Sequence, residues 1–170
     1  MVLQTDRLSL RLAQLDDAAF MLRLLNEPSF LRFIGDRKVR TTADAERYIA
    51  ERLIGSYERH GFGLWIVEQR GTHQAMGISG LVKRDTLPDA DIGFAFLPEY
   101  WGRGFALESA RGVKRHAFEA LELPRLLAIT NPDNVASIRI VETLGLRFDR
   151  ALSLTAGEPE VNLYRVERGQ

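Results

Sequence analysis

Apolar residues recur along the chain with two different spacings. Alternation of apolar and polar residues predicts strands, and apolar residues three or four positions apart predict amphipathic helices. The strands predicted on this basis are residues 7–12, 63–69, 76–84, 91–97, 125–130, 147–154 and 161–167. The predicted helices are residues 16–26, 41–61, 106–121 and 134–145, with a loop at 27–40.

Local signals support the ends of these elements. Thr41 can cap the second helix, with an acid three residues later, and Gly61 is a typical C-terminal stop. Residues 70–72 predict a hairpin turn between the second and third strands. The resulting order, β-α-α-β-β-β-α-β-α-β-β, predicts a mixed α/β sheet in one domain that spans residues 1–170.

Composition narrows the classes of function. Lys plus Arg and Asp plus Glu are both 23, so the formal net charge is zero, and we expect no nucleic-acid or membrane partner. The absence of cysteine excludes disulfides, thiolate metal sites and a cysteine nucleophile. No signal-like apolar block or membrane-length apolar run is present, which predicts a cytoplasmic protein. His60, His73 and His116 show no metal-ligand spacing, so no metal is expected.

The stretch LPEYWGRGFAL, residues 97–107, joins a predicted strand to a predicted helix through a glycine-rich turn. Helix N-termini leave backbone N–H groups unpaired and carry a partial positive charge. A glycine turn before such an end can fold those groups around a phosphate, with Arg103 or Arg111 adding charge. Glycines that serve only the turn geometry are the alternative. The Walker string is absent and GRGFAL lacks a third glycine, so P-loop and Rossmann sites are excluded.

A second string, ITNPDNVASIRIVETLGLRF, places Asn131, Asn134 and Ser137 at a strand end and the following helix start. Together with DIGF, FLPEYWGRGFALESA, the ISGL strand and the N-terminal TDRLSLRLAQLDDA, it resembles the GNAT N-acetyltransferase superfamily. More narrowly, it resembles the RimJ/RimL-type branch, which acetylates protein N-termini and some small amines. The likeness runs over nearly the whole chain. It departs at Trp101, where the superfamily usually has Gln or Arg, so backbone N–H groups rather than this side chain would hold a phosphate.

The resemblance implies a GNAT fold with a mostly antiparallel sheet, splayed between the fourth and fifth predicted strands, and helices on both faces. Acetyl-CoA would lie in the splay as co-substrate. The cofactor-binding residues implied are Phe96, Leu97, Trp101, Gly102, Arg103, Gly104, Phe105, Ala106, Leu107, Asn131, Asn134 and Ser137. Phe96 and Leu97 would offer backbone groups, and Asn134 would offer its amide; a helix cap is the other reading of Asn134.

Acetyl transfer to an amine also needs proton transfer, because an amine with a pKa of ~8–10 is mostly protonated at neutral pH. Asp91 stands in DIGF where this branch often carries an acid, which suggests a catalytic base at the mouth of the splay; a solvated surface aspartate is the alternative. The branch also suggests that Ser137 donates a hydrogen bond to the leaving thiolate, the alternative being a bond to its own helix. Tyr164 lies too far along the chain to be assigned the tyrosine role common in the superfamily.

The amine acceptor stays open among a protein N-terminus, a polyamine, an amino-sugar drug and an amino-acid-like metabolite. Acceptor pockets in such enzymes use the first helices and the loops near residues 33–40 and 83–90, whose mixed charges here select none of these. A different acyl-CoA donor and a non-catalytic CoA-binding sensor or assembly subunit are alternatives. A homodimer formed through an edge strand is a further hypothesis.

Overall fold

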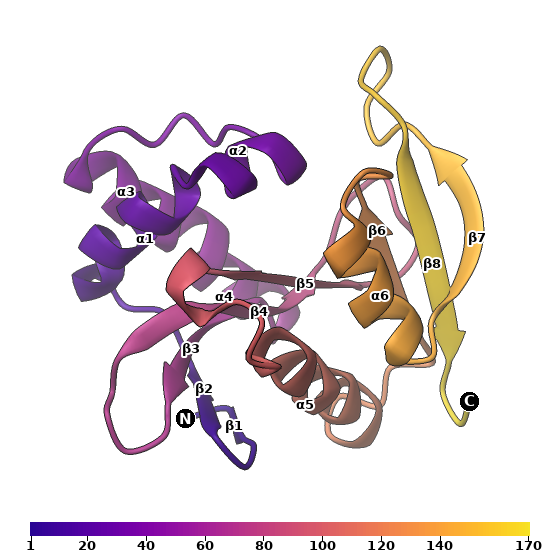
Figure 1. Cartoon of the computed structure of the whole chain (residues 1–170), viewed down its shortest axis with the longest axis horizontal. Helices are drawn as coiled ribbons and strands as arrows, with labels where there is room; N and C mark the ends of the chain where they lie inside the picture. Colours follow the sequence, from indigo (N-terminus) through magenta and orange to yellow (C-terminus); the bar gives the residue numbers. More distant parts are fainter.

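The strands form one eight-stranded sheet in the order β1-β2-β3-β4-β5-β6-β8-β7 (Figure 1). This computed structural model describes residues 1–170. Only β5 and β6 pair in parallel, so the sheet is mixed and mostly antiparallel, as predicted. The strands are β1 (Leu3–Gln4), β2 (Leu8–Arg11), β3 (Leu64–Gln69), β4 (Ala75–Val82), β5 (Asp91–Phe96), β6 (Arg125–Thr130), β7 (Arg147–Leu152) and β8 (Val161–Glu167).

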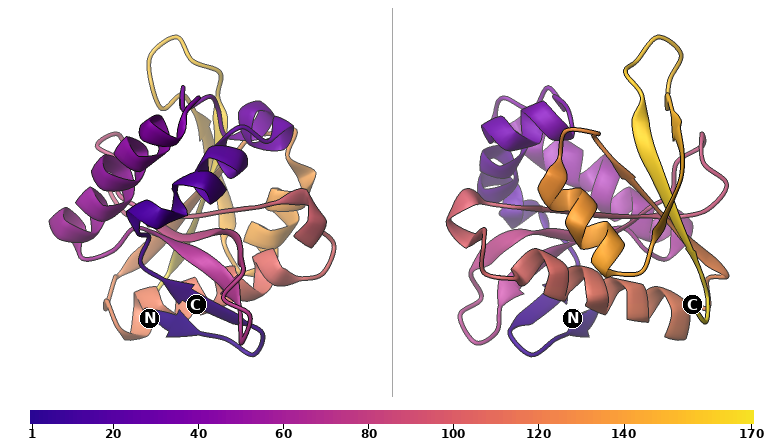
Figure 2. Two further views of the ribbon diagram at one scale, coloured as in Figure 1. Left: turned by 90° about the vertical axis from the view of Figure 1, so that its left-hand side faces the viewer. Right: turned by 45° about the vertical axis from the view of Figure 1, so that its right-hand side comes forward.

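Helices cover both faces of the sheet, which Figure 2 shows from two further sides. The α-helices are α1 (Ala18–Leu25), α2 (Pro28–Phe33), α3 (Thr42–Tyr48), α4 (Gly55–His60), α5 (Phe105–Glu119) and α6 (Val135–Thr143). Short helical turns are η1 (Leu15–Asp17), the π-helical η2 (Ile49–Ile54) and η3 (Pro98–Tyr100). The run α3-η2-α4 is the single helix that the sequence predicts, and it ends at Gly61 with a φ of +76°.

Two elements differ from the sequence prediction. The predicted loop at 27–40 contains α2, which begins at Pro28. Proline disrupts a helix interior but fits its first turn, where the missing N–H costs no hydrogen bond. The edge strand β1 was not predicted, since two residues are too short to show an alternation.

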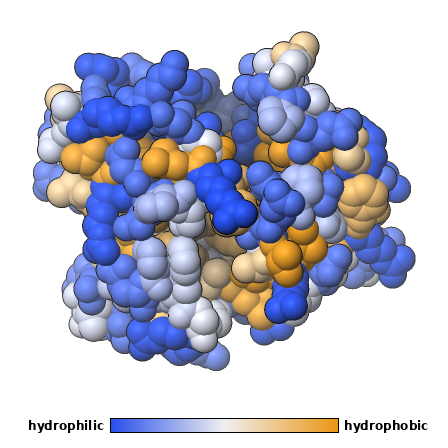
Figure 3. Space-filling view, turned by 45° about the horizontal axis from the view of Figure 1, so that its top comes forward, coloured by the Kyte–Doolittle hydropathy of each residue, from blue (hydrophilic) through white to orange (hydrophobic).

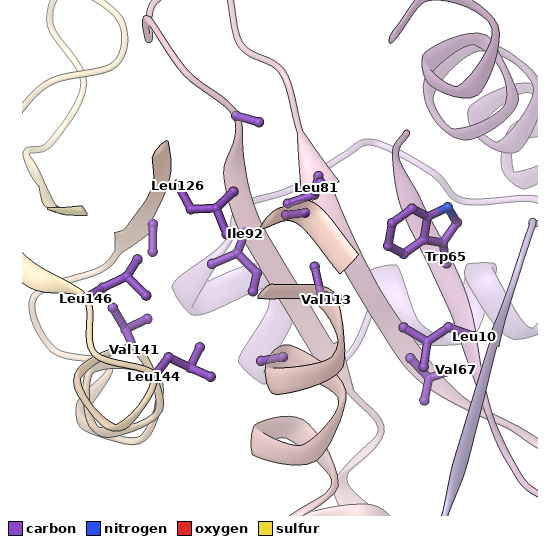
Figure 4. Packing of buried hydrophobic residues seen from close by; sticks show 14 of the residues in the cluster. Leu10, Trp65, Val67, Leu81, Ile92, Val113, Leu126, Val141, Leu144 and Leu146 are labelled. Carbon is purple, nitrogen blue, oxygen red and sulfur yellow. The ribbon is translucent and has the colours of Figure 1, made fainter. Parts of the chain in front are cut away.

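The buried side chains form one core on each face of the sheet. The larger core lies between the sheet and α5 and α6, where Ile92 and Leu126 of the strands meet Val113 and Val141 of the helices (Figure 4). The second core packs α1, α2 and α3 against the other face. Alternation along β5 sends Ile92 into the first core, while Asp91 points to the opposite face.

The sheet opens between β5 and β6. These strands share one paired position, Asp91 opposite Leu127, and the Leu127 N–H donates to the Ala90 carbonyl over 3.0 Å. No further pairing follows toward Phe96 and Thr130, so the two strands diverge from a closed end at Asp91. The predicted splay is therefore present, between the fourth and fifth strands of the sequence prediction.

Candidate active site

The turn between η3 and α5 presents a row of free backbone donors. Gly102 and Gly104 have φ angles of +68° and +80°, a conformation that strains residues with a Cβ. The N–H groups of residues 102–107 donate to no acceptor in the protein, and the Gly104 N-cap has no side-chain cap. Unpaired donors at the positive end of a 15-residue helix form a suitable site for an anion such as a pyrophosphate.

The exposed edge of β5 supplies a second set of backbone groups. The Leu97 N–H donates to Met76 of β4 over 3.0 Å, so the alternation of an antiparallel ladder directs the polar groups of Phe94 and Phe96 toward the splay. The Trp101 indole N–H donates to the Phe96 carbonyl over 2.8 Å. The Phe96 N–H and the Phe94 groups are therefore the donors and acceptors that face the opening. Both backbone groups of Leu97 have partners within the protein, since its carbonyl accepts from the Tyr100 N–H.

The end of β6 faces this edge across the splay and leads into α6. Asn134 caps α6, because its Oδ1 accepts from the Ser137 N–H over 3.2 Å, and its amide NH₂ has no partner. The Ser137 hydroxyl likewise makes no hydrogen bond, whereas the Asn131 Oδ1 accepts a hydrogen bond from the Asp133 N–H over 2.9 Å. Thr130 carries the one buried side-chain polar atom without a partner, its Oγ1. Buried hydroxyls are normally hydrogen-bonded, so this atom suits a ligand with its own polar groups.

Asp91 lies at the closed end of the splay rather than at its mouth. Its side chain is 1% exposed and accepts a hydrogen bond from Arg84 Nε over 2.9 Å. Burial raises the pKa of Asp91 to about 6, against the opposing effect of the Arg84 guanidinium. The solvated-surface reading is therefore excluded, and the carboxyl group can gain and lose a proton near neutral pH.

The surface is hollowed between the part that carries α1 to α3 and the part that carries α6 and β8 (Figure 3). Two carboxylates are paired with arginines: Asp36, in the loop after α2, with Arg40 over 2.5 Å, and Glu99 of η3 with Arg23 of α1 over 2.9 Å. An arginine therefore neutralises each of these two carboxylates.

The histidines lie away from the splay. His116 of α5 packs edge-on against Trp65, and burial lowers its pKa, while the exposed His73 lies 3.5 Å from Glu68. No three His, Asp or Glu side chains gather into a metal-binding set. The longest helices fall short of the length and apolarity that a membrane span requires.

The structure thus brings the predicted turn, β5 edge and α6 residues around one opening, with Asp91 at its closed end. It adds features that were not predicted: the Phe94 backbone groups, the unpartnered Thr130 hydroxyl, the contact of the loop residue Arg84 with Asp91, and the Arg7–Glu108 pair beside the turn. The alternation of β5 could have indicated Phe94, because it shares its side of the strand with Phe96. The other groups depend on contacts between distant segments.

Comparison with known proteins agrees with this geometry. Residues 7–147 match the family described as Acetyltransferase (GNAT) domain. YoaA of Bacillus subtilis, an uncharacterized N-acetyltransferase, is 30% identical over 170 residues, which cover 97% of this chain and 96% of YoaA. The structure of an acetyltransferase from Agrobacterium tumefaciens has a TM-score of 0.82 at 25% identity, covering 97% of this chain and 93% of that one. RimL, a ribosomal alpha-N-protein acetyltransferase in complex with coenzyme A, shares the fold with a TM-score of 0.80 at 14% identity, covering 98% and 97% of the two chains.

The chain therefore belongs to the GNAT acetyltransferase superfamily. It is a GNAT-type N-acetyltransferase with ribosomal-protein acetyltransferases among its structural neighbours, which confirms the resemblance seen in the sequence.

Proposed function

We propose that the protein transfers the acetyl group of acetyl-CoA directly to a primary amine, with both substrates bound together. Enzymes of this superfamily use acetyl-CoA. The observation that carries the proposal is the row of unpaired N–H groups at residues 102–107, beside a strand edge that is open to a ligand. A direct transfer needs no enzyme nucleophile, which agrees with a chain that has no cysteine.

The cofactor would lie along the splay. Its pyrophosphate would accept from the N–H groups of the turn, which the helix dipole of α5 reinforces. Its pantetheine amides would pair with the Phe94 and Phe96 backbone on one side and with the free amide of Asn134 on the other. In this arrangement Trp101 acts by holding the Phe96 carbonyl rather than by binding phosphate.

Asp91 is proposed as the base that receives the proton of the attacking amine. A carboxyl group with a pKa of about 6 is mostly ionised at neutral pH, yet it is basic enough to take up a proton as the amide forms. The 1% exposure of its side chain favours transfer through one water molecule. Arg84 keeps the carboxylate in place from the loop that precedes β5.

Ser137 is proposed to stabilise the departing thiolate. Its hydroxyl has no hydrogen-bond partner and lies one helical turn after Asn134, on the same side of α6. A hydroxyl donor at the sulfur would favour departure of a group whose conjugate thiol has a pKa of ~8.5.

The test is a screen for release of free CoA thiol with acetyl-CoA and a panel of amines: peptides with free N-termini, polyamines, amino sugars and amino acids. Turnover with one class identifies the acceptor, and repeating the assay with succinyl-CoA distinguishes acyl preference. Tight binding of CoA without turnover on any amine would contradict the enzyme proposal and favour a CoA sensor.

A further inference from the structure

The hairpin formed by β1 and β2 is bound to the first turn of α5 through one carboxylate. Glu108 Oε1 accepts from the Thr5 hydroxyl over 2.6 Å and from the Arg7 backbone N–H over 2.8 Å. Glu108 Oε2 accepts from Arg7 Nε over 2.6 Å. Close approach is possible because Gly112 has no side chain: a Cβ there would lie 3.0 Å from Leu3 and from Thr5.

The same arginine also contacts the glycine turn. Arg7 Nη1 donates to the Arg103 carbonyl over 3.0 Å, and the guanidinium lies 4.4 Å from the centre of the Phe105 ring. In a planar trans peptide the carbonyl and the following N–H point in opposite directions. By holding the Arg103 carbonyl on one side, Arg7 therefore fixes the direction of the Gly104 N–H on the other. That N–H is one of the unpaired donors of the turn.

Charge gives Arg7 a second effect on the turn. Glu108 stands in the first turn of α5, where its negative charge would repel a bound pyrophosphate. The ion pair with Arg7 over 2.6 Å offsets that charge. Removing Arg7 would release the carbonyl and also leave the carboxylate unpaired beside the anion site.

We infer that Arg7, held by Glu108, is a positioning residue for the pyrophosphate of the cofactor: it orients the Gly104 N–H and neutralises the one acid in the first turn of α5. The inference rests on the proposed use of acetyl-CoA. It assigns a role in cofactor binding to a residue near the N-terminus, 101 positions before its carboxylate partner in the sequence.

The test is the calorimetric Kd of CoA for purified full-length variants. Arg7→Met is expected to raise the Kd about tenfold, as for a lost hydrogen bond to a charged group. Arg7→Lys should give an intermediate Kd, because an ammonium keeps the charge near Glu108 but cannot also reach the Arg103 carbonyl in the geometry of a guanidinium. The double variant Arg7→Met/Glu108→Gln should bind CoA about threefold more tightly than Arg7→Met, since it removes the unpaired negative charge.

Arg70→Met is the matched control. The Arg70 side chain also donates to the β1–β2 hairpin, to the carbonyls of Thr5 and Asp6 over 3.0 and 3.3 Å. It makes no hydrogen bond to the glycine turn before α5, so its loss should leave the Kd for CoA unchanged. Thermal unfolding shows whether each variant is folded. If Arg7→Met is not folded, the Kd of Arg7→Lys for CoA is compared with that of the wild type instead.

Three results would overturn the inference in distinguishable ways. Wild-type affinity for CoA in Arg7→Met would remove the positioning role and leave the proposed function standing. A double variant no better than Arg7→Met would remove the neutralising role of Arg7 and leave only its hydrogen bond to the Arg103 carbonyl. A wild-type protein that binds no CoA would remove the proposed function together with the inference.

Discussion

Replacement of Asp91 by Asn should lower the acetyl-transfer activity and, at neutral pH, raise the free energy of unfolding. The rise in the pKa of Asp91 from 3.8 to about 6 corresponds to about 3 kcal/mol, which the folded protein loses when this buried carboxyl is ionised. Because the folded-state pKa is raised, stability is highest below pH ~4, falls as the pH rises toward 6, and stays lower above it. Asn carries no charge and removes this cost. Part of the gain is offset, since Arg84 loses its partner, although its side chain is 28% exposed and can be hydrated.

The same substitution should reduce kcat/KM for acetyl transfer by a factor of about 10²–10⁴, the usual contribution of a general base. In the wild-type enzyme, kcat/KM should rise with pH through an inflection near 6, where Asp91 ionises, in addition to the ionisation of the amine itself. The variant should keep only the inflection of the amine.

The assay is the pH profile of CoA thiol release for wild type and Asp91→Asn, with urea unfolding of both at pH 4.5 and pH 7.5 (values chosen about 1.5 units on either side of the raised pKa). We expect a slow variant whose free energy of unfolding changes less between the two pH values than that of the wild type. Undiminished turnover by Asp91→Asn, or an inflection near pH 6 that survives the substitution, would refute the role of this carboxylate as the base.

Two further substitutions test other parts of the structure. Ser137→Ala should lower kcat about tenfold with little change in the KM for acetyl-CoA, because it removes one hydrogen bond that forms mainly in the transition state. Thr143→Ala, on the same helix, is the control and should behave as wild type in the same assay. Equal kcat values for the two variants would exclude the proposed hydrogen bond from Ser137 to the thiolate. Arg11→Met should reduce the free energy of unfolding by about 3 kcal/mol in urea titrations, because Arg11 pairs with Asp17 over 2.8 Å and with Glu68 over 2.6 Å, and both carboxylates are nearly buried. A loss below ~1 kcal/mol would show that water solvates these acids once Arg11 is gone.

Most secondary structure could be predicted because periodicity reports which residues face the core. The strand 91–97 and the helix that starts after Gly104 are both present near their expected bounds. Periodicity does not reveal a helix that buries few side chains or begins with proline. The helix α2 buries one residue, Phe30, and starts at Pro28, so it was predicted as a loop. The splay followed from a family resemblance, since alternation within β5 carries no information on where its neighbour diverges.

The site was predictable only in part for a similar reason. The turn of residues 102–107 is local, so its glycines indicate its geometry. The burial of Asp91 depends on Arg84 and on the loop that folds over it, and the pKa of the carboxyl follows from that burial. The contact between Arg7 and the Arg103 carbonyl joins residues 96 positions apart, and no pattern in the sequence encodes it.

Calorimetric titration of the wild-type protein, Gly104→Val and Gly157→Val with acetyl-CoA tests whether the glycine turn before α5 binds the pyrophosphate. Gly104 and Gly157 have positive φ angles of +80° and +84°, so both substitutions strain the backbone. Gly157 is the control because it lies far from α5 in the sequence, and a Cβ there would meet no atom within 4 Å. We expect micromolar binding of acetyl-CoA by the wild type and by Gly157→Val, and a loss of binding in Gly104→Val. Equal binding by all three folded proteins, or no binding of any CoA species by the wild type, would contradict the assignment of this turn to the pyrophosphate.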